Sequence, residues 1–167
     1  MTTFPTAKVM MANVTQLRIT GTLIWKVNEN SLSNYPSLKW LYLYGNKIER
    51  IADGAFADLR QLVTLYLHDN KIETIGEQAF TGLNKLERLY LYSNSLATLN
   101  SKIFEGLSEL EILHLHRNKI EKIEDGAFFN LSNVDELRLD ENLLSTLDSP
   151  KIFEGLSNLR VLFLPVL

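Results

Sequence analysis

The stretch Leu86–Glu109, LERLYLYSNSLATLNSKIFEGLSE, contains the pattern that decides the fold. In its LYLYSN segment, leucines alternate with polar or aromatic residues, which is the period of a strand with one buried face. The same pattern returns every 24 residues in both directions. A fixed period of this length predicts a solenoid, in which each unit buries its apolar side only against its neighbours. The leading position of the pattern is filled by Val14, Leu38, Leu62, Leu86, Leu110 and Val134, and one residue late by Leu159.

The repeat phase divides the chain into two parts. Residues 1–13 have no phase and are predicted to be an irregular lead-in, whereas residues 14–167 are predicted to form one solenoid. The first unit is degenerate, because Thr22 replaces the asparagine of later units, and terminal units are commonly atypical. One extra residue near Pro150 should bulge outside the strand of its unit. The units are predicted to begin at residues 14, 38, 62, 86, 110, 134 and 159.

Two further columns of residues recur with the same period. An asparagine follows each strand, where a turn into the interior would leave backbone N–H and C=O groups without partners. An inward-facing amide both donates and accepts hydrogen bonds, so these asparagines are expected to stack as a ladder. The ladder residues are Asn46, Asn70, Asn94, Asn118 and Asn142. The second column fills the wider outer half of each coil and consists of Phe56, Phe80, Phe104 and Phe128.

Composition narrows the functional class. The chain is 46% hydrophobic with a formal net charge of −3, which indicates neither a disordered chain nor an evident nucleic-acid or membrane binder. No apolar run reaches the length of a bilayer span. The absence of cysteine removes disulfides and thiolate metal sites. The first thirteen residues lack the continuous apolar segment of a secretory signal.

Units such as LVTLYLHDNKIETIGEQAFTGLNK, residues 62–85, resemble the typical 24-residue subfamily of leucine-rich repeats, LxxLxLxxNxIxxIxxxAFxxLxx. The resemblance covers residues 14–164, and such units occur in ectodomains of Toll-like receptors, Slit-type ligands, neuronal adhesion receptors and insect immune repeat proteins. It implies an α/β repeat fold: a curved solenoid with a parallel sheet on the concave side and short helical or irregular turns on the convex side. It also implies an extracellular or cell-surface glycoprotein that acts in innate immunity or cell adhesion.

The chain departs from those relatives in one respect that bears on its ends. It carries no cysteine-bearing cap and no readable capping helix after Leu164, although solenoids need polar caps for solubility. We therefore expect the chain to be a piece of a longer protein. In the alternative, the apolar end meets a partner or a second copy.

Outward-facing positions of the strands predict three columns of side chains across the concave face. Five of the six tyrosines, all three histidines and one of the two tryptophans fall in these columns. Tyrosine, tryptophan and arginine carry much of the binding energy at protein interfaces. In the alternative interpretation, stacked tyrosines only stabilise neighbouring strands. The candidate partner-binding residues are Trp40, Tyr42, Tyr44, Tyr66, His68, Arg88, Tyr90, Tyr92, His114, His116 and Arg138.

Other chemistries have little support in the sequence. His114 and His116 share a strand face, but His68 should lie about 10 Å away, so no metal site is expected. A pH-sensitive partner contact is an alternative role for His116, which should neighbour Asp140. Phosphate-binding loops, nucleophile elbows and HExxH motifs are absent from the sequence, so neither a cofactor nor an enzyme is expected.

The sequence therefore predicts a non-catalytic recognition module whose concave face binds a macromolecule. The expected partner is a protein, with glycan or lipid as alternatives and no nucleic acid. A receptor or secreted immune-type ectodomain is one reading; an adhesion or matrix-organising module and a cytoplasmic scaffold are the others. The sequons at Asn13 and Asn130 are candidate glycosylation sites if the protein is secreted.

Overall fold

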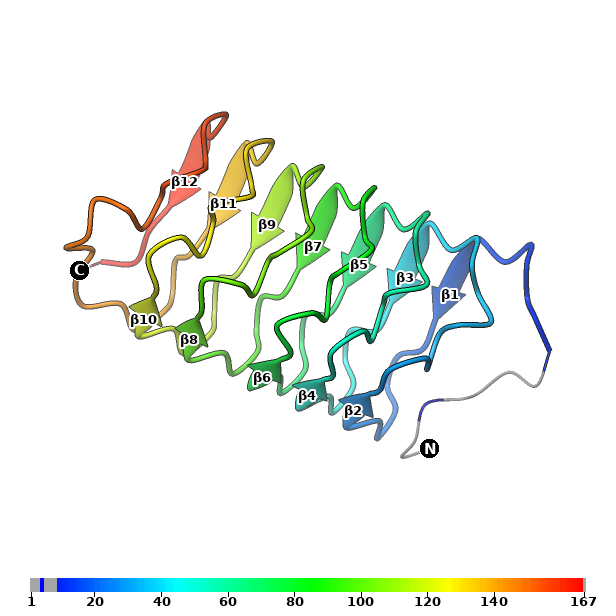
Figure 1. Ribbon diagram of the computed structural model, residues 1–167. Coiled ribbons are helices and arrows are strands. Elements are labelled where there is room, and N and C mark those ends of the chain that lie inside the picture. The colour runs from blue at the N-terminus through cyan, green and yellow to red at the C-terminus, as the bar shows by residue number, and fades with distance from the viewer. Residues whose placement is uncertain (1–3, 5–8, 167) are drawn as a thin grey trace.

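The chain forms a solenoid of stacked coils, shown in Figure 1. The computed structural model describes Phe4 and residues 9–166, so most of the predicted lead-in over residues 1–13 lies outside the described residues. Each coil contributes one strand to a single parallel sheet, in the order β1-β3-β5-β7-β9-β11-β12. The strands are β1 (Gln16–Arg18), β3 (Trp40–Tyr42), β5 (Thr64–Tyr66), β7 (Arg88–Tyr90), β9 (Ile112–His114), β11 (Glu136–Arg138) and β12 (Val161–Phe163).

Shorter strands lie along the opposite side of the coils (Figure 1). They form a three-stranded sheet, β2-β4-β6, and a separate pair, β8 with β10. Among Phe4 and residues 9–166 the connections are irregular and no helix occurs, so of the two predicted kinds of turn the irregular one is present. The predicted solenoid with a parallel sheet is confirmed. These short strands are β2 (Lys26–Val27), β4 (Arg50–Ile51), β6 (Thr74–Ile75), β8 (Thr98–Leu99) and β10 (Lys122–Ile123).

The asparagines that follow the strands form a continuous ladder of hydrogen bonds. The Asn94 amide group donates to Leu67 O and Leu91 O, both at 3.0 Å, and its side-chain oxygen accepts from Ile72 N at 2.9 Å. Each amide thus joins its own unit to the one before it. At the first unit Thr22 stands at the asparagine position, and its hydroxyl donates to Asn46 Oδ1 at 2.6 Å and accepts from Ile24 N at 3.2 Å. Equivalent bonds are made by Asn46, Asn70, Asn118 and Asn142.

The residue before each ladder asparagine has a positive φ angle. Gly45 has a φ of 66°, and the corresponding Asp69, Ser93 and Arg117 have φ angles of 54–55°. This left-handed conformation costs a non-glycine residue about 1 kcal/mol. The asparagine hydrogen bonds offset that cost, because they satisfy the buried N–H and C=O groups that the turn leaves without backbone partners.

The phenylalanine column shows on which side the solenoid curves. Phe56, Phe80, Phe104 and Phe128 stack with ring centroids 6.1–6.5 Å apart. Strands of a sheet lie only about 4.8 Å apart, so the units fan out away from β1–β12 and the sheet lies on the inner side of the curve. Phe153 continues the column at 6.2 Å from Phe128, because the extra residue near Pro150 is absorbed outside the strand and the column.

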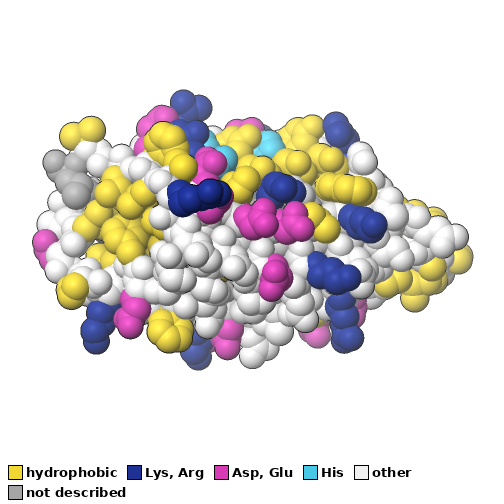
Figure 2. Space-filling view, turned by 90° about the horizontal axis from the view of Figure 1, so that it is seen from above, with side chains coloured by type: hydrophobic (Ala, Val, Ile, Leu, Met, Phe, Trp, Pro, Cys, Tyr) yellow, Lys and Arg dark blue, Asp and Glu magenta, His cyan; other side chains and the backbone are white. Residues whose placement is uncertain are grey.

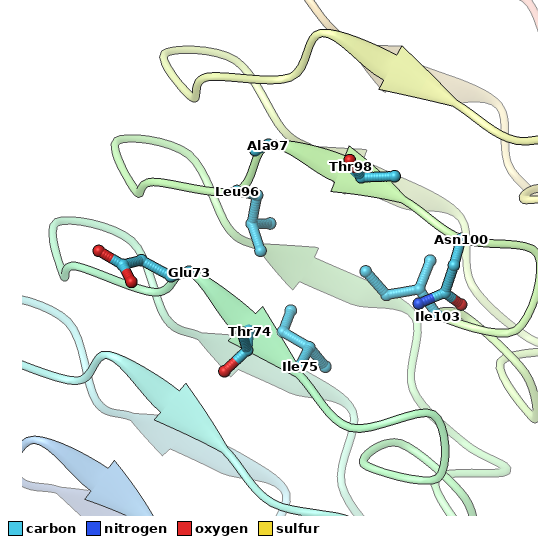
Figure 3. Close-up of a pocket in the computed structure, with 8 residues that line it drawn as sticks. All are labelled: Glu73, Thr74, Ile75, Leu96, Ala97, Thr98, Asn100 and Ile103. Carbon is cyan, nitrogen blue, oxygen red and sulfur yellow. The ribbon is translucent and has the colours of Figure 1, made fainter.

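The outer ladder is interrupted between β6 and β8. In the preceding gap, the Glu73 and Gly76 N–H groups donate to Glu49 O and Ile51 O at 3.0 and 2.9 Å. The corresponding bonds from Ala97 and its neighbours do not occur among the described residues. An open crevice of about 260 Å³ takes their place. Figure 3 shows the residues that line it. They are Glu73, Thr74, Ile75, Leu96, Ala97, Thr98, Asn100 and Ile103.

We attribute this interruption to Ile103. It is buried at a position that Ala55, Ala79 and Ala127 occupy in other units, so it adds three carbons to a packed layer. Added volume in a close-packed core forces neighbouring backbone apart. The next isoleucine at this position, Ile152, coincides with the end of the second outer ladder after β10. The outer pairing thus stops at both units that carry isoleucine at this position, and the second of these units also contains the extra residue near Pro150.

Candidate partner-binding face

A stack of tyrosines crosses the middle of the long sheet. The register pairs Tyr42 on β3 with Tyr66 on β5, and Tyr66 with Tyr90 on β7. Their ring centroids are 4.6 and 5.0 Å apart, with interplanar angles of 6° and 12°. We call these three residues the tyrosine stack. The repeat itself creates it, because one outward position per unit places identical side chains one strand apart.

A second stack runs beside the first, where the strands end. It contains Tyr44, His68, Tyr92 and His116, and we call it the tyrosine–histidine stack. Successive centroids are 4.7, 4.4 and 4.6 Å apart, with rings within 12° of parallel. Edge-to-face contacts such as Tyr66–His68, at 6.1 Å, join the two stacks. Seven rings thus form one aromatic block, in which each ring fixes the orientation of the next.

Polar side chains close the tyrosine stack at both ends. At one end, the Arg18 guanidinium lies 4.6 Å over the Tyr42 ring, and its Nη1 donates to the Tyr44 hydroxyl at 3.2 Å. At the other end, His114 meets the edge of Tyr90 at 5.2 Å, and its Nε2 lies 2.8 Å from a Glu136 carboxylate oxygen. Arg18 is absent from the predicted binding residues. Its outward position, in the same column as the tyrosine stack, was the sequence signal that could have identified it.

Beyond the aromatic block, the cations of the face are already paired with carboxylates. Arg88 contacts Glu87 at 3.2 Å, and Arg138 donates to Asp140 at 2.8 and 3.1 Å. In Figure 2, basic and acidic side chains alternate beside the histidines and the hydrophobic side chains. Two further pairs, Arg117 with Glu141 and Arg160 with Asp135, complete this group.

The titratable groups of the block are tuned mainly by burial. Burial raises the pKa of the Tyr66 and Tyr90 phenols, so these hydroxyls stay neutral donors. Burial lowers the pKa of the His68 and His116 imidazoles, and Arg138 lowers that of His116 further. Their Nδ1 atoms are buried with no hydrogen-bond partner in the described structure, which fits a neutral imidazole. Burial is the largest single influence on the Asp140 carboxyl and raises its pKa, but the hydrogen bond from Arg138, the charge of Arg138 and a backbone hydrogen bond together outweigh burial and lower the pKa.

An outward register position does not always give an exposed side chain. His116, predicted to bind a partner, is only 8% exposed because the stack and neighbouring charged groups cover it, and Thr64 is 2% exposed. Trp40, by contrast, is 37% exposed at the edge of the face. The candidates Asn13 and Asn130 lie off the sheet and are exposed. Whether they carry glycans stays a prediction.

The geometry limits what the face can do. In the tyrosine stack and the tyrosine–histidine stack the inner rings have both faces covered, so they offer a partner only their edges and hydroxyl tips. Within Phe4 and residues 9–166, no group of three or more histidines or carboxylates is placed to hold a metal ion. The same residues include no helix long and apolar enough to cross a membrane. The face therefore offers ring edges and hydroxyl groups for contact with the surface of another molecule.

Comparison with known families settles the class of the protein. The pattern described as Leucine rich repeat matches residues 12–72, 60–120 and 108–165. The chain belongs to the leucine-rich repeat family. These three matches cover nearly the whole solenoid, so the predicted resemblance to this family is confirmed. No curated protein sequence matches this leucine-rich repeat chain.

Solved structures extend the comparison. The chain is similar to TLR13 in a crystal structure of its complex with ssRNA13, at a TM-score of 0.65 and 28% sequence identity over 89% of this chain. The repeat chain spans only 24% of the length of that TLR13 chain. Because 320 solved chains match, likeness of fold does not by itself identify a ligand.

Proposed function

We propose that this leucine-rich repeat protein is a recognition module that binds a protein partner through the tyrosine stack, the tyrosine–histidine stack and the flanking Trp40 and Arg138. It acts without catalysis, outside the cell or at its surface, as a receptor-type or secreted immune-type module. The observation that carries the proposal is the partly exposed aromatic block on the long parallel sheet. Tyrosine offers large contact area at low conformational cost, which is why it anchors protein interfaces.

Single-stranded RNA is a second candidate, because the similar TLR13 chain is solved in complex with ssRNA13. RNA bases bind to proteins by stacking on free aromatic faces, and phosphates need unpaired cations. Here the inner tyrosines have neighbours on both faces. Arg88 and Arg138 are paired with carboxylates, and the chain has a net charge of −3. These features favour a polypeptide partner.

The test is a selection against the intact protein from two sources. One is a displayed polypeptide library that pools random linear peptides with a three-helix scaffold randomised on one helix; the other is a pool of random single-stranded RNA. Affinities of the enriched binders are then measured for Tyr66→Ser/Tyr90→Ser. The matched control is Phe129→Ser, which removes an exposed aromatic ring, 60% accessible, away from the sheet.

We expect polypeptide binders whose affinity falls at least tenfold in the double tyrosine variant and stays within about twofold in the control. Melting curves establish that both variants remain folded. Enrichment from the RNA pool alone, or polypeptide binders that bind the double variant unchanged, would overturn the proposal.

A further inference from the structure

The tyrosine stack has a repeat distance that distinguishes between kinds of polypeptide. Tyr42, Tyr66 and Tyr90 follow one another at 4.6 and 5.0 Å. One turn of an α-helix advances about 5.4 Å, whereas alternate residues of a strand advance about 6.7 Å. Across the three tyrosines a helix therefore drifts by about 1 Å and a strand by about 4 Å. Only the helix keeps one side chain near each hydroxyl.

The hydroxyl tips are free to make such contacts. In the described part of the chain, the hydroxyls of Tyr42, Tyr66 and Tyr90 bond to no other protein group, whereas the Tyr44 hydroxyl accepts from Arg18. The rings are locked by stacking, so ordering the hydroxyls costs little entropy when a partner arrives. A row of fixed donors and acceptors, on rings whose centroids lie 4.6 and 5.0 Å apart, is thus presented along the solenoid axis.

The charges around the row have a direction. Arg18 lies at the β1 end, where no carboxylate pairs with it among the described residues. At the other end, residues in and near β9, β11 and β12 supply five carboxylates against three guanidinium groups. An α-helix carries partial negative charge at its C-terminus and partial positive charge at its N-terminus. The carboxylates are Glu111, Asp135, Glu136, Asp140 and Glu141, and the guanidinium groups are Arg117, Arg138 and Arg160.

We infer that the partner presents an α-helix that lies along the solenoid axis over the tyrosine stack, with its C-terminal end at Arg18 and its N-terminal end toward Asp140. This inference rests on the proposed function, and it names the kind of protein segment recognised. The five strand spacings from β1 to β11 span about 24 Å, which corresponds to about 16 helical residues.

The selection already described tests the inference when its two polypeptide components are sequenced separately. We expect binders from the randomised helix to be enriched over linear peptides. Against these binders, Tyr66→Phe keeps the ring stack but removes one hydroxyl, and should weaken binding about fivefold. Tyr35→Phe removes the one tyrosine hydroxyl outside the face and should change affinity by less than about twofold. Arg18→Glu should weaken binding about tenfold.

Each other outcome has a defined meaning. Enrichment of linear peptides alone, with binding lost in Tyr66→Ser/Tyr90→Ser, overturns the helical partner and leaves the proposed function standing. Helical binders that are insensitive to both Tyr66→Phe and Arg18→Glu also overturn it. Enrichment of RNA alone, or of nothing from any library, overturns the helical partner and the proposed function together.

Discussion

At the scale of the residue, the ladder asparagines stabilise the turn after each strand and connect neighbouring units through hydrogen bonds. The Asn94 amide bonds to Leu67 O, Leu91 O and Ile72 N, all of which are buried. Its replacement by alanine leaves these groups without partners. We expect Asn94→Ala to lower the free energy of unfolding by about 2–4 kcal/mol in urea denaturation.

Asn133 provides the control for that substitution. Like Asn94, it donates an amide hydrogen bond to a backbone carbonyl. This bond, to Ser108 O at 2.8 Å, lies in an exposed position. Water replaces such a bond, so Asn133→Ala should cost less than about 0.5 kcal/mol. Equal losses in the two variants would show that the ladder does not carry the stability assigned to it.

The histidines of the tyrosine–histidine stack give a prediction for pH. Burial lowers the pKa of His68 and His116 in the folded protein, so unfolding favours their protonation. Their contribution to stability is present above the ordinary pKa near 6.5 and is lost as pH falls through the lower folded pKa. The Asp140 carboxyl, whose pKa is also lowered, titrates at more acidic pH. We expect the free energy of unfolding to decrease between about pH 7.5 and about pH 5.5.

The variant His68→Phe/His116→Phe isolates this effect, because it keeps rings in the stack and retains His114 with Glu136. Chemical denaturation at both pH values should show a smaller pH dependence in the variant than in the wild type. An identical dependence in both proteins would assign the effect to other groups.

At the scale of the element, we attribute the unpaired outer strands to one side chain. β6 and β8 are unpaired where the unit carries Ile103, whereas β4 and β6 pair where the unit carries Ala79 at the same position. We expect Ile103→Ala to close the crevice, so that the amides of Ala97 and Asn100 exchange with solvent more slowly. Hydrogen exchange followed by NMR measures this directly.

The reverse substitution is the matched control. Ala79→Ile should open the gap between β4 and β6 and speed exchange at the Glu73 and Gly76 amides, whose hydrogen bonds cross that gap. If neither substitution alters exchange, the volume of the side chain is not the cause of the split.

The crevice between β6 and β8 also marks the limit of what the sequence predicts. The period predicted the strands, the asparagine ladder and the phenylalanine column, because one residue type recurs at one offset and equal coils must stack. The split at Ile103 was readable only as isoleucine among alanines, and its effect depends on packing volume. The burial of His116 and the parallel orientation of the rings depend on side-chain rotamers, which a repeat period does not determine.

At the scale of the whole molecule, stability comes mainly from the contacts between neighbouring units. Phe104 stacks on Phe80 and Phe128, in the middle of the array, whereas Phe153 has a ring on one side only. We expect Phe104→Ala to cost about 3–5 kcal/mol and to separate unfolding into two transitions, since it weakens the joint between two halves.

Phe153→Ala serves as the comparison at the end of the array. It should cost about 1–2 kcal/mol and fray the last unit without splitting the main transition. Circular dichroism and tyrosine fluorescence recorded through the same urea titration distinguish these cases. A single coincident transition for Phe104→Ala would mean that the solenoid unfolds as one unit.

The proposed partner-binding face is most directly tested by the hydrogen-exchange footprint of a polypeptide binder selected against the intact protein. We predict slower exchange at the amides of β3, β5 and β7 and the residues directly after them, with the outer strands β4, β6 and β8 unchanged. Slower exchange confined to the outer strands or to the crevice beside Ile103, with the sheet unaffected, would contradict the assignment of the aromatic block as the binding surface.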